Sequence, residues 1–369
     1  MPEPPLISVI IPVYQVQGYL AECLDSVLGQ KFADVEVIAV DGGSTDGSAT
    51  ILDERAARDG RLRVLHLGRT GPGPARNEGL RQATGDYVWF VDGDDALTAR
   101  SLEAVADLLR RNDPDVLLID YEYVYPDGHT APSPGVALLG SLPDGCFTLA
   151  QQPAVINLAM TIWSKIIRRE FLVSLGQPFP DGIHEDVPVS CAALLSASKI
   201  SAVQATAEQA GAVQAGAAGP ACYRYRQHRR GSFMIQTTEA HFDIFRSYRL
   251  VFELAAKRAA GGDPMITGPV EAALFERAIW HYTTILGKGG WGIGPVGADG
   301  LVPRRLRRRF FAMMHADFLT HRPAGYRHPA GARGAKFRLI ERDAYWTYSV
   351  LEPLNMLLRA RVRQALSRN

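Results

Sequence analysis

The sequence has few cysteines, no long apolar run and almost no net charge. The four cysteines are Cys23, Cys146, Cys191 and Cys222, and no two form a Cys-x-x-Cys pair, which disfavours a zinc site and fits small buried thiols in a reducing compartment. No run of about 18 apolar residues is present, and the first residues lack the basic start of a secretory signal. We therefore expect no membrane-spanning segment and a cytoplasmic protein, either free or peripheral at the inner face of the membrane.

The net charge of +1 over 369 residues hides an uneven distribution. From Leu301 to Asn369 the sequence has 15 Lys and Arg but 4 Asp and Glu. The helices of such a basic tail could bind an anionic polymer or a membrane surface. They could equally present a solvated face, form the interface of a homo-oligomer or pack on the rest of the chain, and we rank this last arrangement highest.

Short apolar runs alternate with amphipathic stretches over the first 125 residues. Apolar runs of this length indicate buried strands, and apolar residues at helical spacing indicate the connecting helices. The alternation predicts an α/β fold with a mostly parallel, doubly wound sheet flanked by helices. The expected strands are 8–11, 35–40, 62–67, 87–91 and 116–124, and the expected helices lie around 20–28, 46–56, 74–83 and 102–109.

Polar clusters follow three of these strands. They are Pro12–Gln15 after the first strand, Asp41–Ser44 after the second and Asp92–Asp95 after the fourth. In doubly wound sheets, ligands bind beyond the carboxyl ends of the strands. The three clusters therefore predict one binding site at that edge of the sheet.

The rest of the chain has a different pattern. Residues from about 204 to 219 are rich in Ala, Gly and Gln and are expected to form a flexible insertion. Apolar spacing predicts helices over 241–257, 269–286, 304–318 and from Phe337 to the end, with a break at Pro353. We expect two regions, residues 1–235 and a C-terminal helical appendage over residues 236–369.

Several segments, in this order and spacing, resemble family 2 glycosyltransferases with the GT-A fold, a Rossmann-like arrangement. The segments ISVIIPVY (7–14), VDGGSTDGS (40–48), ARNEGL (75–80), ATGDY (83–87) and VDGDD (91–95) are similar to motifs of that family. WSK (163–165), FPDGIHED (179–186) and YRQHRRGS (225–232) resemble the branch that builds bacterial envelope polymers, including teichoic-acid and capsule glycosyltransferases. The resemblance covers about residues 6–235 and implies that residues 1–235 are the catalytic domain.

The aspartates after the fourth strand suit a metal-assisted transfer. Release of a nucleotide diphosphate from its sugar builds negative charge, which Mg²⁺ or Mn²⁺ can neutralise through carboxylate and phosphate oxygens. By resemblance, Asp94 binds the metal directly, Asp92 binds the metal or the ribose, and Asp95 contacts the sugar. The structural alternative is a polar turn before the next helix.

An inverting transferase also needs a base that deprotonates the acceptor hydroxyl. By resemblance this base is Asp186, and Glu185 positions the acceptor or the base. Two adjacent carboxylates repel each other, which can raise the pKa of one of them. The alternative is that the pair begins a helix, where acidic residues are favoured. His184 beside them is interpreted as a local hydrogen-bonding residue.

The same resemblance assigns the contacts to the donor's diphosphate and sugar. Arg226 and Ser232 correspond to phosphate-contacting positions, and an Arg fork suits phosphate oxygens. Arg76 corresponds to an arginine near the donor sugar, although an ion pair on a helix surface is the alternative. Trp163 could form a wall for a sugar or lie in the core.

Base recognition is assigned to Pro12, Tyr14 and Asp41. An aromatic ring such as Tyr14 can stack on a base, but it could equally cap the core. A second carboxylate that commonly binds the pyrimidine N3–H in the family is replaced by Gly42. Either Asp41 or a backbone carbonyl takes this role, or the nucleotide is not UDP.

Together these features predict an inverting, metal-dependent hexosyltransferase. It would move a hexose or N-acetylhexosamine from a UDP-sugar to a hydroxyl of a cell-envelope glycan or polyol-phosphate polymer, with no nucleic-acid partner. A nucleotide-dependent oxidoreductase would need Gly-x-Gly-x-x-Gly after the first strand, which residues 12–15 lack. The remaining alternatives are a non-catalytic glycan-binding or scaffolding module and a transferase with a non-UDP donor.

Overall fold

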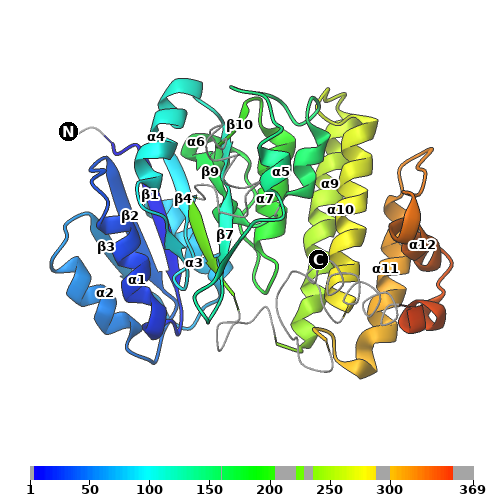
Figure 1. Ribbon diagram of the computed structural model, residues 1–369, viewed down its shortest axis with the longest axis horizontal. Helices are drawn as coiled ribbons and strands as arrows, with labels where there is room; N and C mark the ends of the chain where they lie inside the picture. The colour runs from blue at the N-terminus through cyan, green and yellow to red at the C-terminus, as the bar shows by residue number, and fades with distance from the viewer. Residues whose placement is uncertain (1–3, 159, 204–221, 228–235, 288–299, 352–369) are drawn as a thin grey trace, which may run out of the picture.

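A computed structural model describes residues 4–158, 160–203, 222–227, 236–287 and 300–351 of the chain. An α/β region is followed by a group of α-helices (Figure 1). The predicted insertion around residues 204–219 and the predicted break at Pro353 lie outside the described residues, as does Ser232.

A seven-stranded sheet, in the order β10-β6-β9-β4-β1-β2-β3, forms the centre of the α/β region. The four strands β4, β1, β2 and β3 pair in parallel, whereas β9 runs antiparallel between β4 and β6. The mostly parallel sheet predicted from the alternation is therefore confirmed, and β9 is an antiparallel strand that the pattern did not reveal. The strands are β1 (Ile7–Val13), β2 (Val35–Asp41), β3 (Leu62–His66), β4 (Tyr87–Phe90), β6 (Val116–Leu118), β9 (Lys165–Arg168) and β10 (Ile200–Ala202).

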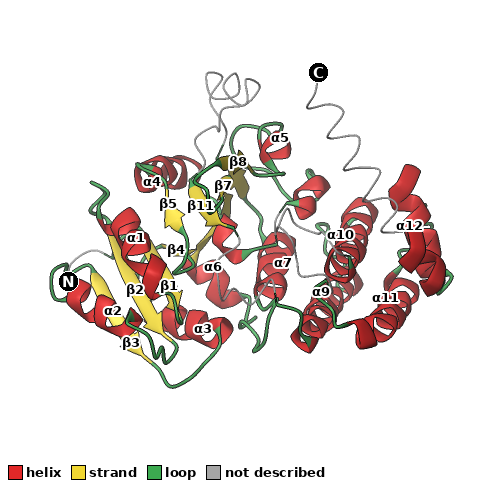
Figure 2. Ribbon diagram, turned by 60° about the horizontal axis from the view of Figure 1, so that its bottom comes forward, coloured by secondary structure: helices red, strands yellow, loops and turns green. Residues whose placement is uncertain are grey.

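Helices cover both faces of this sheet (Figure 2). Because successive side chains of a strand point to opposite faces, Val9 and Ile11 of β1 pack in one apolar cluster with α1, α2 and α4, while Ile10 packs in the other with α3 and α7. This double burial explains why β1 and β4 are apolar along nearly their whole length. The helices are α1 (Gln17–Leu28), α2 (Ser48–Ala56), α3 (Pro72–Gln82), α4 (Ser101–Asn112), α5 (Val136–Leu139), α6 (Arg169–Ser174) and α7 (Asp186–Ser196).

The predicted strand 116–124 is wrong as a single element, because the structure divides it between two sheets. Its first part is β6, and its second part is β7 (Tyr121–Val124) in a four-stranded sheet with β5 (Ala96–Leu97), β8 (Thr130–Pro132) and β11 (Tyr223–Arg226). At the break, the N–H of Ile119 still donates to Ser164, but the carbonyl of Asp120 accepts from Cys222, next to β11. The chain changes sheets here because its new partner is a strand about 100 residues later.

The C-terminal helices confirm the predicted spacing with small shifts. They are α9 (Asp243–Ala260), α10 (Gly268–Leu286), α11 (Arg307–His321) and α12 (Gly331–Glu341). The helix predicted from Phe337 starts earlier, at Gly331, and is interrupted at Asp343, whose backbone is left-handed with φ +50°. Several arginines of the basic tail pair with acidic residues of the chain, among them Arg308 with Asp343.

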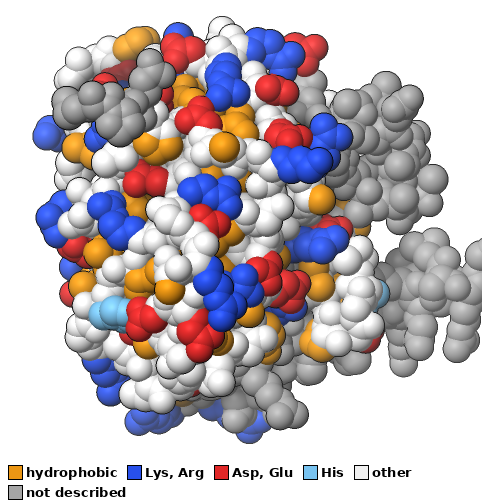
Figure 3. All heavy atoms as spheres, turned by 90° about the vertical axis from the view of Figure 1, so that its left-hand side faces the viewer, with side chains coloured by type: hydrophobic (Ala, Val, Ile, Leu, Met, Phe, Trp, Pro, Cys, Tyr) orange, Lys and Arg blue, Asp and Glu red, His pale blue; other side chains and the backbone are white. Residues whose placement is uncertain are grey.

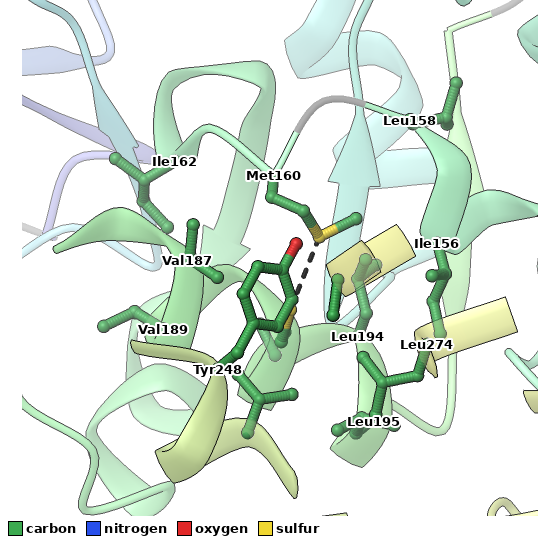
Figure 4. Packing of buried hydrophobic residues seen from close by; sticks show 14 of the residues in the cluster. Ile156, Leu158, Met160, Ile162, Val187, Val189, Leu194, Leu195, Tyr248 and Leu274 are labelled. Atoms are coloured by element: carbon green, nitrogen blue, oxygen red, sulfur yellow. Dashed lines mark hydrogen bonds between the residues drawn. The ribbon is translucent and has the colours of Figure 1, made fainter. Parts of the chain in front are cut away.

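One apolar cluster extends from the sheet through α7 into α9, α10, α11 and α12. Figure 4 shows its centre, where Tyr248 of α9 and Leu274 of α10 lie beside Val187 and Leu194 of α7. The apolar core thus includes residues from both sides of the predicted boundary at residue 235. The division of the chain into two regions at this residue stays a prediction. No helix among the described residues is long and apolar enough to cross a membrane. The face in Figure 3 carries basic and acidic side chains intermixed, with no large block of one sign.

Candidate active site

The carboxyl ends of β1, β2 and β4 lie at one edge of the sheet, because these strands are parallel neighbours. The three predicted polar clusters therefore meet at this edge. Gly93, within the third cluster, lies so close to the end of β1 that a Cβ there would be 3.1 Å from the carbonyl oxygen of Pro12. This close approach brings the Asp92–Asp95 turn against the carboxyl end of β1.

Arg76 connects this edge to α7. Its Nη2 is 2.7 Å from Oδ1 of Asp92, and its Nη1 pairs with the carboxylate of Glu185. The Arg76 side chain is only 5% exposed, so this is a buried ion-pair network and not a pair on the helix surface. Burial opposes the charge of the guanidinium, but Asp92, Glu185 and Asp186 outweigh it and raise the pKa of Arg76.

Asp186 is the first residue of α7 and lies beside this network. Burial, followed by the charge of Glu185, raises the pKa of Asp186 to about 7, while Arg76 and Lys165 act in the opposite direction. A carboxylate with a pKa near neutrality is suited to accept a proton from a hydroxyl at physiological pH. The raised pKa that was expected from two adjacent carboxylates is thus found on Asp186.

Strand β11 holds the aspartate turn from the other side. The hydroxyl of Tyr223 donates to Oδ2 of Asp95 at 2.7 Å and accepts from the backbone N–H of Asp92 at 3.2 Å. The second oxygen of Asp95 accepts from the backbone N–H of Arg226 at 2.8 Å. Asp95 is 1% exposed, and each of its carboxylate oxygens already accepts one hydrogen bond. The predicted contact of Asp95 to the donor sugar would therefore require the surroundings of this carboxylate to rearrange.

The side chain of Arg226 lies at the same turn. Its Nε donates to the carbonyl oxygen of Asp94 at 2.9 Å, its Nη2 is 2.9 Å from Glu22, and its guanidinium lies over the ring of Tyr19. This places a partly exposed cation next to the predicted metal ligands. Its contact to a diphosphate stays a prediction.

Asp92 and Asp94 are the residues that could hold a divalent cation. Asp92 uses Oδ1 for Arg76, and Asp94 is partly exposed. Among the described residues, no group of three or more His, Cys, Asp or Glu is arranged to hold a metal ion. Mg²⁺ is commonly held by one or two carboxylates together with substrate phosphates, so these two aspartates fit a cation that binds along with a diphosphate.

At the other end of the edge, Asp41 is held by its own loop. It is 4% exposed, accepts from the N–H of Ser44 at 3.0 Å and lies 3.4 Å from Nδ1 of His66. Pro12, which lies within β1 because this strand extends two residues beyond the predicted end at residue 11, and Tyr14, on the loop after it, are half-buried. These placements are compatible with the predicted contacts to a base and do not test them.

Gly42 has a structural reason to lack a side chain. Its N–H donates to Val13, its carbonyl accepts from Thr70, and a Cβ would be 3.0 Å from the Thr70 carbonyl oxygen. A carboxylate at this position would need the chain around Thr70 to move. The departure from the family pattern is therefore accompanied by a closely packed loop.

Two functional features escaped sequence reasoning or were left open by it. Trp163 is 3% exposed and stacks on Tyr223 at 4.5 Å, so it supports the residue that holds Asp92 and Asp95 and does not form an open wall. Lys165 is 1% exposed, its Nζ donates to the carbonyl of Thr161, and burial lowers its pKa to about 8. The WSK motif was the signal for this residue, but it gave no indication that the lysine would influence Asp186.

Comparisons with known proteins show similarity to glycosyltransferases in sequence and in fold. Residues 8–173 match the model of glycosyl transferase family 2. The uncharacterized glycosyltransferase EpsJ of Bacillus subtilis is 31% identical over 199 residues, which cover 53% of this chain and 58% of that protein. The poly(ribitol-phosphate) beta-glucosyltransferase of Bacillus spizizenii is 35% identical over 116 residues, which cover 30% of this chain and 18% of the relative. The chain thus spans about half of the first relative and a smaller part of the second.

Among solved structures, S. aureus TarS 1-349 in complex with UDP superimposes with a TM-score of 0.65 and 21% identity, over 95% of this chain and 91% of that one. The same fragment has also been solved with UDP-GlcNAc, with a TM-score of 0.59. At this level of identity the likeness establishes the fold, which includes the C-terminal helices because nearly the whole chain is covered. This chain therefore has the GT-A-like fold, and its residues 8–173 match the model of glycosyl transferase family 2.

Proposed function

We propose that the protein is an inverting, metal-dependent glycosyltransferase that uses a UDP-hexose or UDP-N-acetylhexosamine. The observation that carries the proposal is the network in which Arg76 connects Asp92, at the predicted donor side, to Glu185, next to the predicted base. It brings carboxylates about 90 residues apart in the sequence into one site. A folded scaffold without activity would not need these buried charges, which are costly unless they are paired.

In the proposed reaction, the acceptor oxygen bonds to the anomeric carbon while the bond from that carbon to the diphosphate breaks. Asp186 takes the proton of the acceptor hydroxyl, for which its pKa of about 7 is suited. When bound at Asp92 and Asp94, Mg²⁺ or Mn²⁺ would neutralise the charge of the departing diphosphate. Arg226 lies next to these aspartates, where it could add a further positive charge.

The nature of donor and acceptor is supported by similarity. TarS was solved with UDP and with UDP-GlcNAc, and one relative is a poly(ribitol-phosphate) glucosyltransferase. We infer that the acceptor is a hydroxyl of a cell-envelope glycan or polyol-phosphate polymer. The buried Asp41, the last residue of β2, is the candidate for recognition of the base because Gly42 has no side chain.

The proposal is tested with purified protein, Mn²⁺, a panel of UDP-, GDP- and CDP-sugars, and glycan or polyol-phosphate acceptors. Release of UDP together with a product of inverted anomeric configuration, measured by NMR, is expected. The Asp186→Asn variant should bind UDP in calorimetry as the wild type does, but lose about 10²–10⁴-fold in transfer rate, the usual contribution of a general base.

Three results would contradict the proposal in different ways. Transfer at wild-type rate by Asp186→Asn removes Asp186 as the base. Transfer only from a GDP- or CDP-sugar supports the non-UDP alternative. Binding of glycan without binding of any nucleotide, with or without Mn²⁺, supports the non-catalytic module.

A further inference from the structure

The loop that leads into Glu185 and Asp186 is held by the beginning of α9 at two backbone positions. Oδ2 of Asp243 accepts from the N–H of Ile183 at 3.1 Å. The hydroxyl of Ser247, one helical turn later, donates to the carbonyl oxygen of His184 at 3.0 Å. Two consecutive residues of the loop are therefore fixed by one helix that comes about 60 residues later in the sequence.

A pair of buried histidines provides a third contact. Nε2 of His184 lies 3.3 Å from Nδ1 of His241, and Nε2 of His241 lies 3.0 Å from the carbonyl oxygen of Gln236. A carbonyl only accepts hydrogen bonds, so Nε2 of His241 carries its hydrogen and Nδ1 is left as an acceptor for His184. Burial lowers the pKa of His184 to about 3 and also lowers that of His241, so both rings are neutral and the contact is a hydrogen bond.

The backbone of this loop adopts conformations that require such support. Gly182 has φ +104°, and a Cβ there would be 2.2 Å from Oδ2 of Asp243, so the approach of α9 depends on glycine. His184 has φ +62°, which is unusual for a residue with a side chain. Left-handed conformations of this kind persist where the surrounding contacts impose them.

Helix α9 is itself fixed to α7 by apolar packing. Tyr248, in the second turn of α9, is fully buried and lies with Val187 and Val189 of α7 in the same cluster (Figure 4). The helix that holds the loop is therefore attached to the helix that Asp186 begins. Any displacement of α9 would therefore move both the loop before Glu185 and the helix α7.

We propose that His241, Asp243 and Ser247 are positioning residues that fix the Glu185–Asp186 pair for acceptor deprotonation. The inference rests on the proposed function, in which Asp186 is the base. It makes the start of α9 and the turn before it a support of the catalytic pair, although their residues need not touch either substrate. Small displacements of a catalytic group suffice to lower a rate about 10²-fold.

The test compares Asp243→Ala with Asp243→Asn in the full chain. Both remove the charge of Asp243 at the start of α9, but the asparagine oxygen can still accept from Ile183. We expect Asp243→Ala to lower kcat for transfer by about ten- to a hundredfold, with the dissociation constant for UDP unchanged within about twofold. Asp243→Asn should restore most of the rate, and Ser247→Ala should reduce kcat in the same way.

Tyr282→Phe is the matched control. It removes a buried hydroxyl of the same helical region, which donates to Asp317 at 2.8 Å far in sequence from the loop. It should lower the melting temperature as Ser247→Ala does while leaving kcat unchanged. If Tyr282→Phe lowers kcat as much as Ser247→Ala at equal loss of stability, the effect is one of stability alone and the inference is overturned.

Hydrogen–deuterium exchange separates this inference from the proposed function. Backbone amides of residues 183–187 should exchange faster in Asp243→Ala than in the wild type and in Asp243→Asn. Unchanged exchange in this segment overturns the inference even if no sugar transfer is found. Absence of transfer by the wild-type protein with every nucleotide sugar contradicts the proposed function, while the exchange data still decide whether α9 fixes the loop.

Discussion

Replacement of Arg76 by methionine tests whether the buried ion-pair network is as central as the geometry indicates. Arg76 is 5% exposed and is the cation between Asp92 and Glu185. Methionine fills a similar volume but leaves the two carboxylates without their shared partner. Breaking a buried ion pair by removing one partner costs about 3–5 kcal/mol, because the remaining charge stays buried. We expect Arg76→Met to lose stability of this order at pH 8.

The pH dependence of that loss has a definite sign. Arg76 lowers the pKa of Asp186, which burial and Glu185 have raised to about 7, so the variant should have this pKa above 7. A buried carboxyl whose pKa is raised above its unfolded value destabilises the folded state at high pH; the cost begins to fall as the pH drops through the folded-state pKa and is gone below the unfolded value. Two proteins with different folded-state pKa values for this group differ in cost only above the lower of the two values. The difference in the free energy of unfolding between wild type and variant should therefore narrow when the pH falls from 8.5 to 6. It should narrow by about 1.4 kcal/mol for each unit by which the pKa of Asp186 differs between the two proteins.

The assay is urea denaturation followed by circular dichroism at pH 6 and pH 8.5. Arg81→Met is the control, because Arg81 lies on the same helix and pairs with Glu78 at the exposed surface. This control should unfold at nearly the wild-type urea concentration at both values of pH. A loss below about 1 kcal/mol in Arg76→Met, the range of exposed pairs, or a loss that does not change with pH, would refute the reasoning.

Two further predictions follow from the pKa of Asp186 and from the tyrosine below the aspartate turn. The transfer rate should rise with pH through about 7 as Asp186 loses its proton. Lys165→Met should move this rise to higher pH, because Lys165 lowers the pKa of Asp186. A rise at the same pH in both proteins would contradict the assigned effect of the lysine. Tyr223→Phe removes the hydroxyl that bonds Asp95 and the N–H of Asp92 and should cost about 1–3 kcal/mol in urea denaturation, together with weaker Mn²⁺-dependent binding of UDP in calorimetry. An unchanged Mn²⁺ dependence would show that the hydroxyl does not shape the turn.

The strands that could be predicted are those in which a run of consecutive residues is apolar. β1, β2 and β4 are mostly apolar because helices cover both faces, and the polar clusters lie at their carboxyl ends and in the turns that follow. The antiparallel β9 and the division between β6 and β7 could not be predicted in this way. These strands have three or four residues each, and their partners lie about 50 or 100 residues away in the sequence.

The same reasoning explains what was missed at the site. Asp92 follows a buried strand and could be proposed from its surroundings in the sequence, whereas Asp186, at the start of α7, was proposed from the family resemblance. The role of Arg76, which connects Asp92 to Glu185 beside Asp186, depends on a contact across 109 residues. The pair of His184 and His241 is likewise invisible locally, because a histidine next to an acidic pair gives no indication of a second ring 57 residues later.

The distribution of charge within the site supports the proposed metal dependence. After burial, the largest causes that raise the pKa of Asp95 are the charges of Asp94 and Asp92, and the same aspartates also raise the pKa of Cys23 and Tyr225. The environment of the aspartate turn is therefore strongly negative. A diphosphate would add further negative charge there, and a divalent cation between the two is the simplest way to make that approach favourable.

The base lies in a different electrostatic environment. Arg76 and Lys165 both lower the pKa of Asp186 and so hold it within the range in which it can exchange a proton. These two cations are fixed by burial, whereas the divalent cation at the aspartate turn would arrive with the donor and add to Arg76 and Arg226, which already lie beside this turn. The site would then have a permanently charged acceptor side and a donor side that is completed only when nucleotide and metal bind. On this reasoning, Mn²⁺ should bind far more tightly in the presence of UDP than in its absence, and equal affinity in calorimetry under the two conditions would contradict it.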